Sequence, residues 1–173
     1  LHRLGIGRLD VVVATHADFD HVGGLPAVAR RMRPRRFIFD ADDPSPRLAD
    51  VERAMGRAGA KLVGLERPRR LRAGEASVRI AGGRGGGISG NDASLVTSIR
   101  FGGRRVLLPG DIERGRERRL VRSDASYAAG IDILKVPHHG SLKSSSAGFL
   151  NVLQPEVAVV SAGRFNAFGH PHP

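Results

Sequence analysis

The chain has 173 residues, of which 40% are hydrophobic, and its mean hydropathy is −0.20. This length is typical of one domain with a buried core, and the composition excludes a wholly disordered chain and a chain embedded in a membrane. No apolar run approaches the roughly 20 residues of a membrane-spanning helix, so the chain as given is expected to be soluble. Because the sequence contains no cysteine, it excludes disulfides, thiolate metal sites and cysteine nucleophiles.

Basic residues outnumber acidic ones by 28 to 17, which gives a formal net charge of +11. Only Lys61, Lys135 and Lys143 are lysines, so the charge is almost entirely arginine. Arginine binds phosphate at two points, which favours an anionic partner, and the alternative is a solvated arginine-rich surface. Two clusters could follow a phosphate backbone: Arg30, Arg31, Arg33, Arg35 and Arg36, and then Arg67, Arg69, Arg70 and Arg72.

The first half of the chain alternates predicted strands with predicted helices. Residues 10–15 form a short β-branched apolar run that is typical of a buried strand. Apolar residues at helical spacing, with Pro26 in the first turn, predict a helix over residues 25–32. Further elements are a strand at residues 36–39, a helix at 48–58, a strand at 61–63 and a basic turn region at 67–74.

The second half introduces antiparallel pairing. Two runs, residues 95–101 and 105–108, flank Gly102 and Gly103, which predicts a hairpin. The remaining elements are a strand at residues 77–80, an exposed helix at 113–122, a strand at 131–136, a helix at 146–153 and a strand at 157–160. The predicted class is therefore mixed α/β.

A glycine-rich stretch, residues 82–90, formally contains the G-x-G-x-x-G pattern from Gly85 to Gly90. A dinucleotide site needs a helix directly after that pattern, and the next predicted element is a strand. We therefore interpret the stretch as a surface loop and expect no small organic cofactor.

Metal-ligand side chains are crowded directly after the first predicted strand. The sequence there includes His16, Asp18, Asp20 and His21, followed by Gly23 and Gly24. Alternate residues of an extended segment point the same way, so His16, Asp18 and Asp20 can converge while His21 approaches from the neighbouring side. The two glycines allow the backbone to turn tightly.

Two later predicted strands also end in ligand-type residues. Asp111 follows residues 105–108, and its carboxylate could bridge two cations or simply cap the next helix. His138 and His139 follow residues 131–136, where His139 could also be a structural hydrogen-bonding group. Active sites of layered α/β folds lie at strand ends, so three such endings predict a common site.

These motifs together resemble the metallo-β-lactamase fold. The combination H-x-D-x-D-H with Gly-Gly, then Pro-Gly-Asp, then Pro-His-His-Gly-Ser is similar to the C-terminal hydrolase domain of the ComEC family of competence proteins. The resemblance extends over residues 4–172 and includes residues 91–96 and 161–171. It implies an αββα sandwich, here one domain over residues 1–173 that lacks its first strands. The chain is therefore expected to be a fragment truncated at the N-terminus, with truncation at the C-terminus as well being the alternative.

The resemblance also implies two divalent metal ions, zinc or manganese. His16 and Asp18 would face one metal, Asp20 and His21 the other, Asp111 would bridge them, and His138 would complete the second. His139 is the less favoured ligand and is assigned with Asp20 and Asp111 to catalysis. The intervening histidine ligand of the fold has no counterpart before Asp111. The residues assigned to substrate contact are Asn91, Ser94, Ser141 and His170, with a turn cap as the alternative role of Ser141.

The function implied is that of a metal-dependent phosphodiesterase or nuclease acting on DNA, single-stranded by preference, during DNA uptake. The partner would be a membrane channel domain preceding this chain, so the longer protein would be membrane-associated. Alternatives are a free-standing, cytoplasmic hydrolase of a small anionic or acyl substrate, and a metal-free DNA-binding appendage of a membrane channel. Base stacking has little support among the larger aromatic residues, since Tyr127 is the sole tyrosine and there is no tryptophan.

Overall fold

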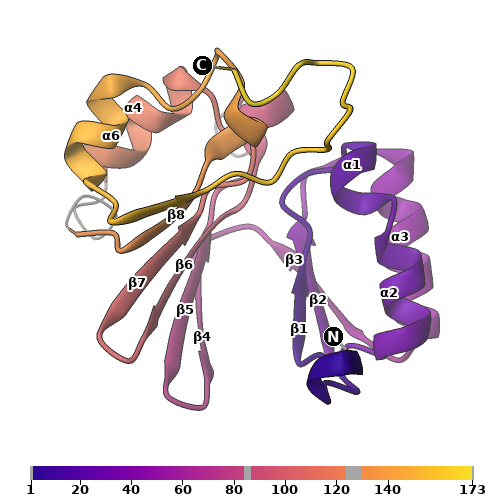
Figure 1. Ribbon diagram of the computed structural model, residues 1–173. Coiled ribbons are helices and arrows are strands. Elements are labelled where there is room, and N and C mark those ends of the chain that lie inside the picture. Colours follow the sequence, from indigo (N-terminus) through magenta and orange to yellow (C-terminus); the bar gives the residue numbers. More distant parts are fainter. Residues whose placement is uncertain (1, 84–86, 124–129, 173) are drawn as a thin grey trace.

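The computed structural model describes residues 2–83, 87–123 and 130–172. Two sheets pack face to face, and helices cover the outer face of each, so the described chain has four layers in the order α, β, β, α (Figure 1). This is the layer order expected from the sequence.

The first sheet contains three parallel strands in the order β1-β2-β3, with three helices on its outer face. Its elements are β1 (Val11–Val13), α1 (Phe19–Val22), α2 (Leu25–Met32), β2 (Arg36–Asp40), α3 (Pro46–Arg57) and β3 (Lys61–Leu65). Parallel neighbours require crossover connections, which the helices provide. Leu48, Val51 and Met55 recur at helical spacing in α3 and are buried in a core with Phe37 of β2.

The second sheet has six strands in the order β4-β5-β6-β7-β8-β9, antiparallel from β4 to β7 and parallel from β7 to β9. Its strands are β4 (Arg69–Ala73), β5 (Ala76–Ala81), β6 (Val96–Phe101), β7 (Arg104–Leu108), β8 (Ile133–Lys135) and β9 (Val157–Val159). Helices α4 (Arg114–Ser123) and α6 (Ala147–Leu153) cover part of its outer face, where Leu107, Leu134 and Phe149 are buried together.

A third apolar core lies between the two sheets. It contains Ile38 and Leu65 from the first sheet and Ile80 from the second, together with Leu95 just before β6. Because this core fixes the two sheets relative to each other, it also fixes the strand ends that carry the ligand-type residues.

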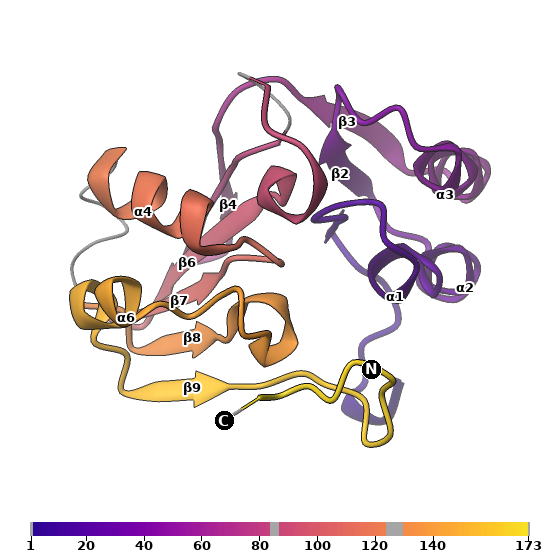
Figure 2. The same cartoon turned by 90° about the horizontal axis from the view of Figure 1, so that it is seen from above.

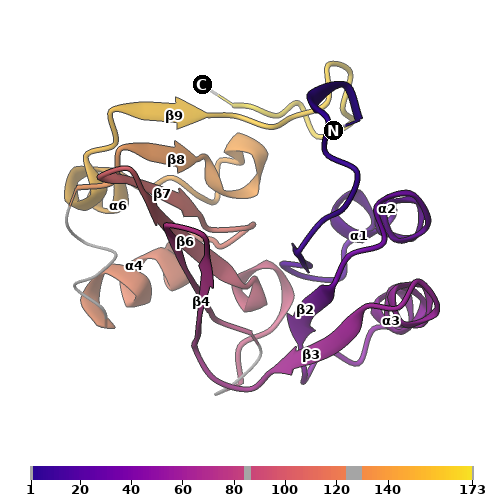
Figure 3. The same ribbon diagram turned by 90° about the horizontal axis from the view of Figure 1, so that it is seen from below.

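The strand ends meet at one edge of the sandwich. Three short 3₁₀ helices complete the description: η1 (His2–Leu4), η2 (Gly90–Ala93) and η3 (Pro137–Gly140). Seen from above, the segments that follow β1, β7 and β8 approach one another next to η2 (Figure 2). The view from below shows the opposite ends of the sheets, with the helices on the two outer faces (Figure 3).

Some local predictions were wrong. The predicted basic turn at 67–74 is instead strand β4 with its turn, because Leu71 joins the core between the sheets and β5 supplies the pairing partner. The segment containing Asp20 and His21 is the short helix α1 rather than an extended loop. Helix α4 was expected to be exposed, but Glu117 and Leu120 are buried.

The glycine-rich stretch lies partly outside the described residues, at 84–86. The predicted strand is present as β6, but it is not the next element, because the short 3₁₀ helix η2 comes before it. Within the described ranges, no helix combines the length and the apolar composition that crossing a membrane requires.

Candidate metal centre

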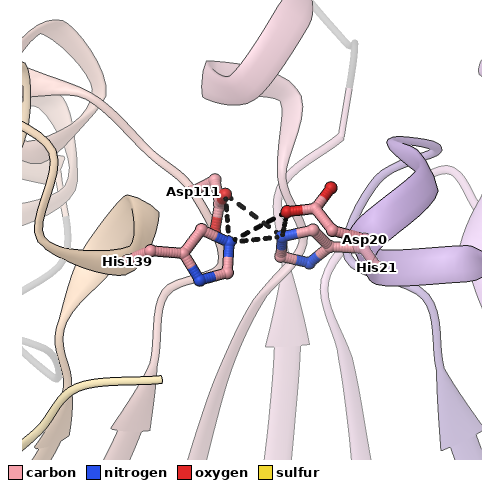
Figure 4. A group of neighbouring side chains, drawn as sticks. All are labelled: Asp20, His21, Asp111 and His139. Atoms are coloured by element: carbon pink, nitrogen blue, oxygen red, sulfur yellow. Dashed lines mark hydrogen bonds and ion pairs between the residues drawn. The ribbon is translucent and has the colours of Figure 1, made fainter. Parts of the chain in front are cut away.

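Four ligand-type side chains converge at the edge where the strands end (Figure 4). Asp20 and His21 lie in α1, Asp111 lies three residues after β7, and His139 lies in η3. One ligand atom from each side chain lies within 4.8 Å of the others. Asp20 is exposed, whereas Asp111 is buried and the two histidines are partly buried, so the group is open to solvent on one side only.

The atoms that face one another in this group are carboxylate oxygens and imidazole Nε2 atoms. Nε2 of His139 lies 3.2 Å from Oδ2 of Asp20, 3.2 Å from Oδ2 of Asp111 and 3.1 Å from Nε2 of His21. Nε2 of His21 lies 3.1 Å from the same Asp111 oxygen. Two carboxylates and two imidazoles in such proximity require a positive charge between them, either a proton or a metal ion.

Hydrogen bonds behind the histidines orient them for this role. Nδ1 of His139 donates to the backbone carbonyl of Ser161, which can only accept, so the Nε2 lone pair is directed into the group. Nδ1 of His21 lies 3.1 Å from Oγ1 of Thr15, a hydroxyl oxygen able to accept its proton. An outer N–H bound in this way is the usual arrangement of histidines that ligate metal ions.

A second pair, His16 and Asp18, lies beside the group of four. The His16 ring is buried, and its centroid is 4.1 Å from that of His21. Nδ1 of His16 lies near Thr15 Oγ1 and Ser94 Oγ, at 3.1 and 3.3 Å. Its Nε2 atom is buried, has no hydrogen-bond partner among the described residues, and lies 3.6 Å from Oδ2 of Asp18.

The pKa of His16 is lowered, first by burial of its ring and then by the neighbouring charge of His21. The ring is therefore neutral near pH 7, which is the form that binds metal ions. A buried, neutral and unpartnered imidazole nitrogen beside a carboxylate fits the position of a metal ligand. His16 Nε2 thus lies near Asp18, and His21 Nε2 lies 3.7 Å from Oδ2 of Asp20, while the division of these residues between two metals stays a prediction.

Asp111 is held by a residue that the sequence analysis did not assign to the site. Nζ of Lys135, the last residue of β8, lies 3.2 Å from Oδ1 of Asp111 and donates to the carbonyl of Gly110. Burial alone would raise the pKa of Asp111, but the hydrogen bond with His21 and the charges of His21, Lys135 and His139 bring it below its usual range. Oδ1 is thus engaged by Lys135, and Oδ2 faces the histidines. The sequence signal that could have identified Lys135 is its position at the end of the predicted strand that directly precedes His138 and His139.

The structure places His139 where the sequence analysis predicted His138. Both histidines have left-handed backbone conformations, with φ of 46° for His138 and 54° for His139, and their side chains diverge. Nε2 of His138 lies 3.4 Å from Nδ2 of Asn91, and Nδ1 of His138 lies 3.6 Å from Oε1 of Glu113. Of these two histidines, His139 and not His138 belongs to the group of four in the described part of the chain.

The predicted substrate-contact residues have different placements. Ser94 is completely buried, and its Oγ accepts the backbone N–H of Asp111 at 3.0 Å, so it supports the site from below and direct substrate contact is wrong. Asn91 lies between Glu113 and His138. Oγ of Ser141 accepts from the backbone N–H of Lys143, which corresponds to the turn-cap alternative. His170 lies beside the ring of His139, with parallel ring planes.

A cavity of about 720 Å³ adjoins the group of four, and two members of the group, Asp20 and His139, line it. Asp18, Asp20, His139 and His170 line it on the side of the ligand-type residues. The other lining side chains include Arg47 at the start of α3 and two exposed aromatic rings, Phe19 and Phe168. The sequence analysis looked for stacking groups only among tyrosine and tryptophan and missed these two phenylalanines.

Comparisons with known proteins agree with this architecture. Residues 1–164 match the metallo-β-lactamase superfamily. The chain is 31% identical over 170 residues to ComE operon protein 3 of Bacillus subtilis strain 168, and 32% identical over 177 residues to competence protein ComA of Neisseria gonorrhoeae. These alignments cover 97% and 99% of this chain but only 22% of either relative.

A solved structure shows the shared fold. CmlA, a diiron β-hydroxylase from Streptomyces venezuelae, matches 88% of this chain and 35% of its own, with a TM-score of 0.57 and 18% identity. Together with the layer order, the strand-end ligands and the family match over residues 1–164, this likeness places the chain in the metallo-β-lactamase superfamily.

Proposed function

We propose that the chain is a metal-dependent hydrolase that cleaves phosphodiester bonds in DNA and acts in DNA uptake. The observation that carries this proposal is the group Asp20, His21, Asp111 and His139, two of whose members, Asp20 and His139, line the large cavity. The alignments of nearly the whole chain with part of two competence proteins support this biological setting. The net charge of +11 favours a polyanionic substrate.

The residues fit two divalent metal ions, zinc or manganese. Asp20, His21, Asp111 and His139 would hold one, and His16 with Asp18 would contribute to the other. Imidazole suits zinc, and carboxylate oxygen suits manganese, so a donor set without thiolate admits either. When bound, such ions lower the pKa of water towards neutrality and stabilise negative charge on phosphate oxygens.

The chain's own residues bind and orient the substrate. Arg47 presents a guanidinium to the cavity for a phosphate next to the one cleaved. His170 lies at the same wall, and its pKa is lowered, first by burial and then by His138 and His172. Its neutral ring has one N–H group that donates a hydrogen bond to a substrate oxygen without giving up the proton. Ser161 keeps His139 in one tautomer, and Lys135 keeps Asp111 in one orientation.

The relatives are far longer than this chain, since it spans 22% of each. We therefore propose that the domain works within a longer, membrane-associated protein in which a channel segment delivers single-stranded DNA to the cavity.

The test is cleavage of labelled single-stranded and duplex DNA by the purified chain with manganese or zinc, with and without chelator. The Asp20→Ala variant removes one carboxylate from the group of four. Asp42→Ala is a matched control, because Asp42 is an exposed aspartate outside the site. We expect chelator-sensitive cleavage that Asp42→Ala retains and Asp20→Ala loses by roughly a hundredfold or more.

Other outcomes would overturn the proposal. DNA binding that persists in chelator, without cleavage under any metal, would instead identify a DNA-binding appendage. Hydrolysis of a small phosphodiester or acyl compound with DNA left intact would identify a hydrolase of small substrates.

A further inference from the structure

Arginines gather on the outer face of the second sheet, away from the metal centre. Register and strand alternation put Arg70 of β4, Arg79 of β5, Arg100 of β6 and Arg105 of β7 on the same face. The opposite face of these strands carries Leu71, Val78 and Ile80, which belong to the core between the sheets. The arginines therefore face outward by the same alternation that buries the apolar residues.

These side chains line a cavity of about 170 Å³. The hydroxyl-bearing residues Ser77 and Ser98 lie among them, and none of the described residues that line this cavity is acidic. Helices α4 and α6 cover one end of this face, and the hairpin ends of β4 to β7 extend beyond them (Figure 1). None of these lining residues also lines the cavity over the metal centre.

Like charges are paired directly across the strands. Arg70 is opposite Arg79, and Arg100 is opposite Arg105. Such a concentration of positive charge on one face of the sheet favours an anionic ligand. A guanidinium group donates two parallel hydrogen bonds to a phosphate group, and neighbouring hydroxyl groups can donate further ones.

We propose that this arginine face binds the phosphodiester backbone of a nucleic acid strand, at a site separate from the metal centre. Arg79 is opposite Ser98, so the pair Arg100 and Arg105 is displaced by two residues from the pair Arg70 and Arg79. The four arginines therefore extend across the sheet, which suits a chain of regularly spaced phosphates better than one isolated anion. Of the predicted cluster at residues 67–72, Arg70 and Arg72 lie on this face by strand alternation. Arg79, Arg100 and Arg105 join Arg70 around the cavity from later strands. The proposal rests on the proposed DNA substrate for its setting, but its binding step needs no metal.

The test measures binding of a fluorescent single-stranded oligonucleotide to the purified chain in chelator, over a series of salt concentrations. Arg70→Gln with Arg100→Gln removes two exposed arginines from the face. Arg30→Gln with Arg31→Gln is the matched control, because it removes the same charge from exposed positions in α2. We expect the first double variant to bind roughly tenfold or more weakly and its salt slope to fall by about 1.4, since each single-strand phosphate contact contributes about 0.7.

The outcomes separate this site from the metal centre. Equal losses in the two double variants would mean that only net charge matters and would overturn the proposal. Preferential binding of anionic lipid vesicles over the oligonucleotide, lost in the Arg70 and Arg100 variant, would also overturn it, because the face would then be a membrane contact. Hydrolysis of a small phosphodiester should be unchanged in both double variants. If the chain has no hydrolase activity, the binding measurement still tests the arginine face, because it is made in chelator. Thermal melting of each variant verifies folding.

Discussion

The Nε2 atoms of His21 and His139 lie 3.1 Å apart and face each other. His139 donates its other ring proton to the Ser161 carbonyl, so its Nε2 atom carries a lone pair whenever the ring is neutral. The Asp111 and Asp20 oxygens approach the same nitrogen. Two carboxylates and two imidazoles in such proximity require a positive charge among them. The group therefore favours binding of a cation.

The first prediction separates the two adjacent histidines. His139→Ala should weaken binding of zinc or manganese by roughly a hundredfold or more, because it removes a donor from the group of four. His138→Ala should weaken it by much less, since His138 contacts Asn91 and faces Glu113 instead. Calorimetric titration of both variants with each metal checks this, and a larger loss in His138→Ala would restore the sequence-based assignment.

The second prediction concerns Ser94, which supports two parts of the site from below. Ser94→Ala removes the acceptor of the Asp111 backbone N–H and a neighbour of His16 Nδ1, both in buried surroundings. We expect a loss of about 1–3 kcal/mol in the free energy of unfolding, measured by urea denaturation in chelator. Ser89→Ala, at an exposed position before η2, is the control and should change stability little. Unchanged stability in Ser94→Ala would contradict the supporting role.

The third prediction concerns Glu117, a completely buried carboxylate of α4. It accepts the backbone N–H groups of Ser145 and Ser146 and the Ser146 hydroxyl, where α6 begins. Glu117→Gln should lower the free energy of unfolding by about 2–3 kcal/mol, because charge-assisted hydrogen bonds are lost in a buried place. Glu66→Gln, at an exposed position, is the control in the same denaturation experiment. Equal stability of the two variants would show that the buried charge contributes nothing.

The fourth prediction follows from the lowered pKa of His16, which burial causes first and the charge of His21 second. Below the ordinary value of 6.5 the unfolded chain takes up a proton at this residue while the folded chain does not. The contribution of His16 to stability is therefore complete above that value and is lost as the pH falls below it. In chelator, His16→Gln should show a shallower fall in unfolding free energy from pH 7 to pH 5. An unchanged slope would mean that His16 titrates normally in the folded chain.

The fifth prediction concerns the aromatic wall of the large cavity. Phe19 is 72% exposed although it is apolar, and it lies beside Asp20. If bases stack on it, Phe19→Ala should weaken single-stranded DNA binding roughly tenfold. Phe165→Ala is the control, because Phe165 is 92% exposed and does not line the cavity. Equal affinities of the two variants, measured by fluorescence anisotropy in chelator, would exclude stacking at Phe19.

Much of the architecture follows from sequence periodicity. Apolar runs such as that around Val12 and helical spacing such as Leu48, Val51 and Met55 determine which face is buried, and both were predicted. Strand β4 was missed because it lies at the edge of its sheet, with only Leu71 facing the core and arginines on the other face. Its pairing with β5 is a tertiary interaction that local composition does not reveal.

The candidate site was predicted in outline for a related reason. The alternation of strands and helices indicates that the ends of β1, β7 and β8 share one edge of the sandwich. The residues that follow these strands must therefore lie close together. The choice between His138 and His139 depends instead on backbone angles within η3, and neighbouring identical residues carry no signal about them. Lys135 was overlooked because its partner Asp111 lies 24 residues away.

The paired left-handed residues of η3 constrain how this segment can evolve. With φ of 46° and 54°, each of positions 138 and 139 excludes β-branched side chains and costs ordinary residues about 1–2 kcal/mol. Asparagine, aspartate and glycine tolerate this conformation best. Among homologues, substitutions at position 138 should therefore be limited to residues that tolerate the left-handed conformation. If position 139 is always histidine, the imidazole itself is required there and not only the backbone conformation.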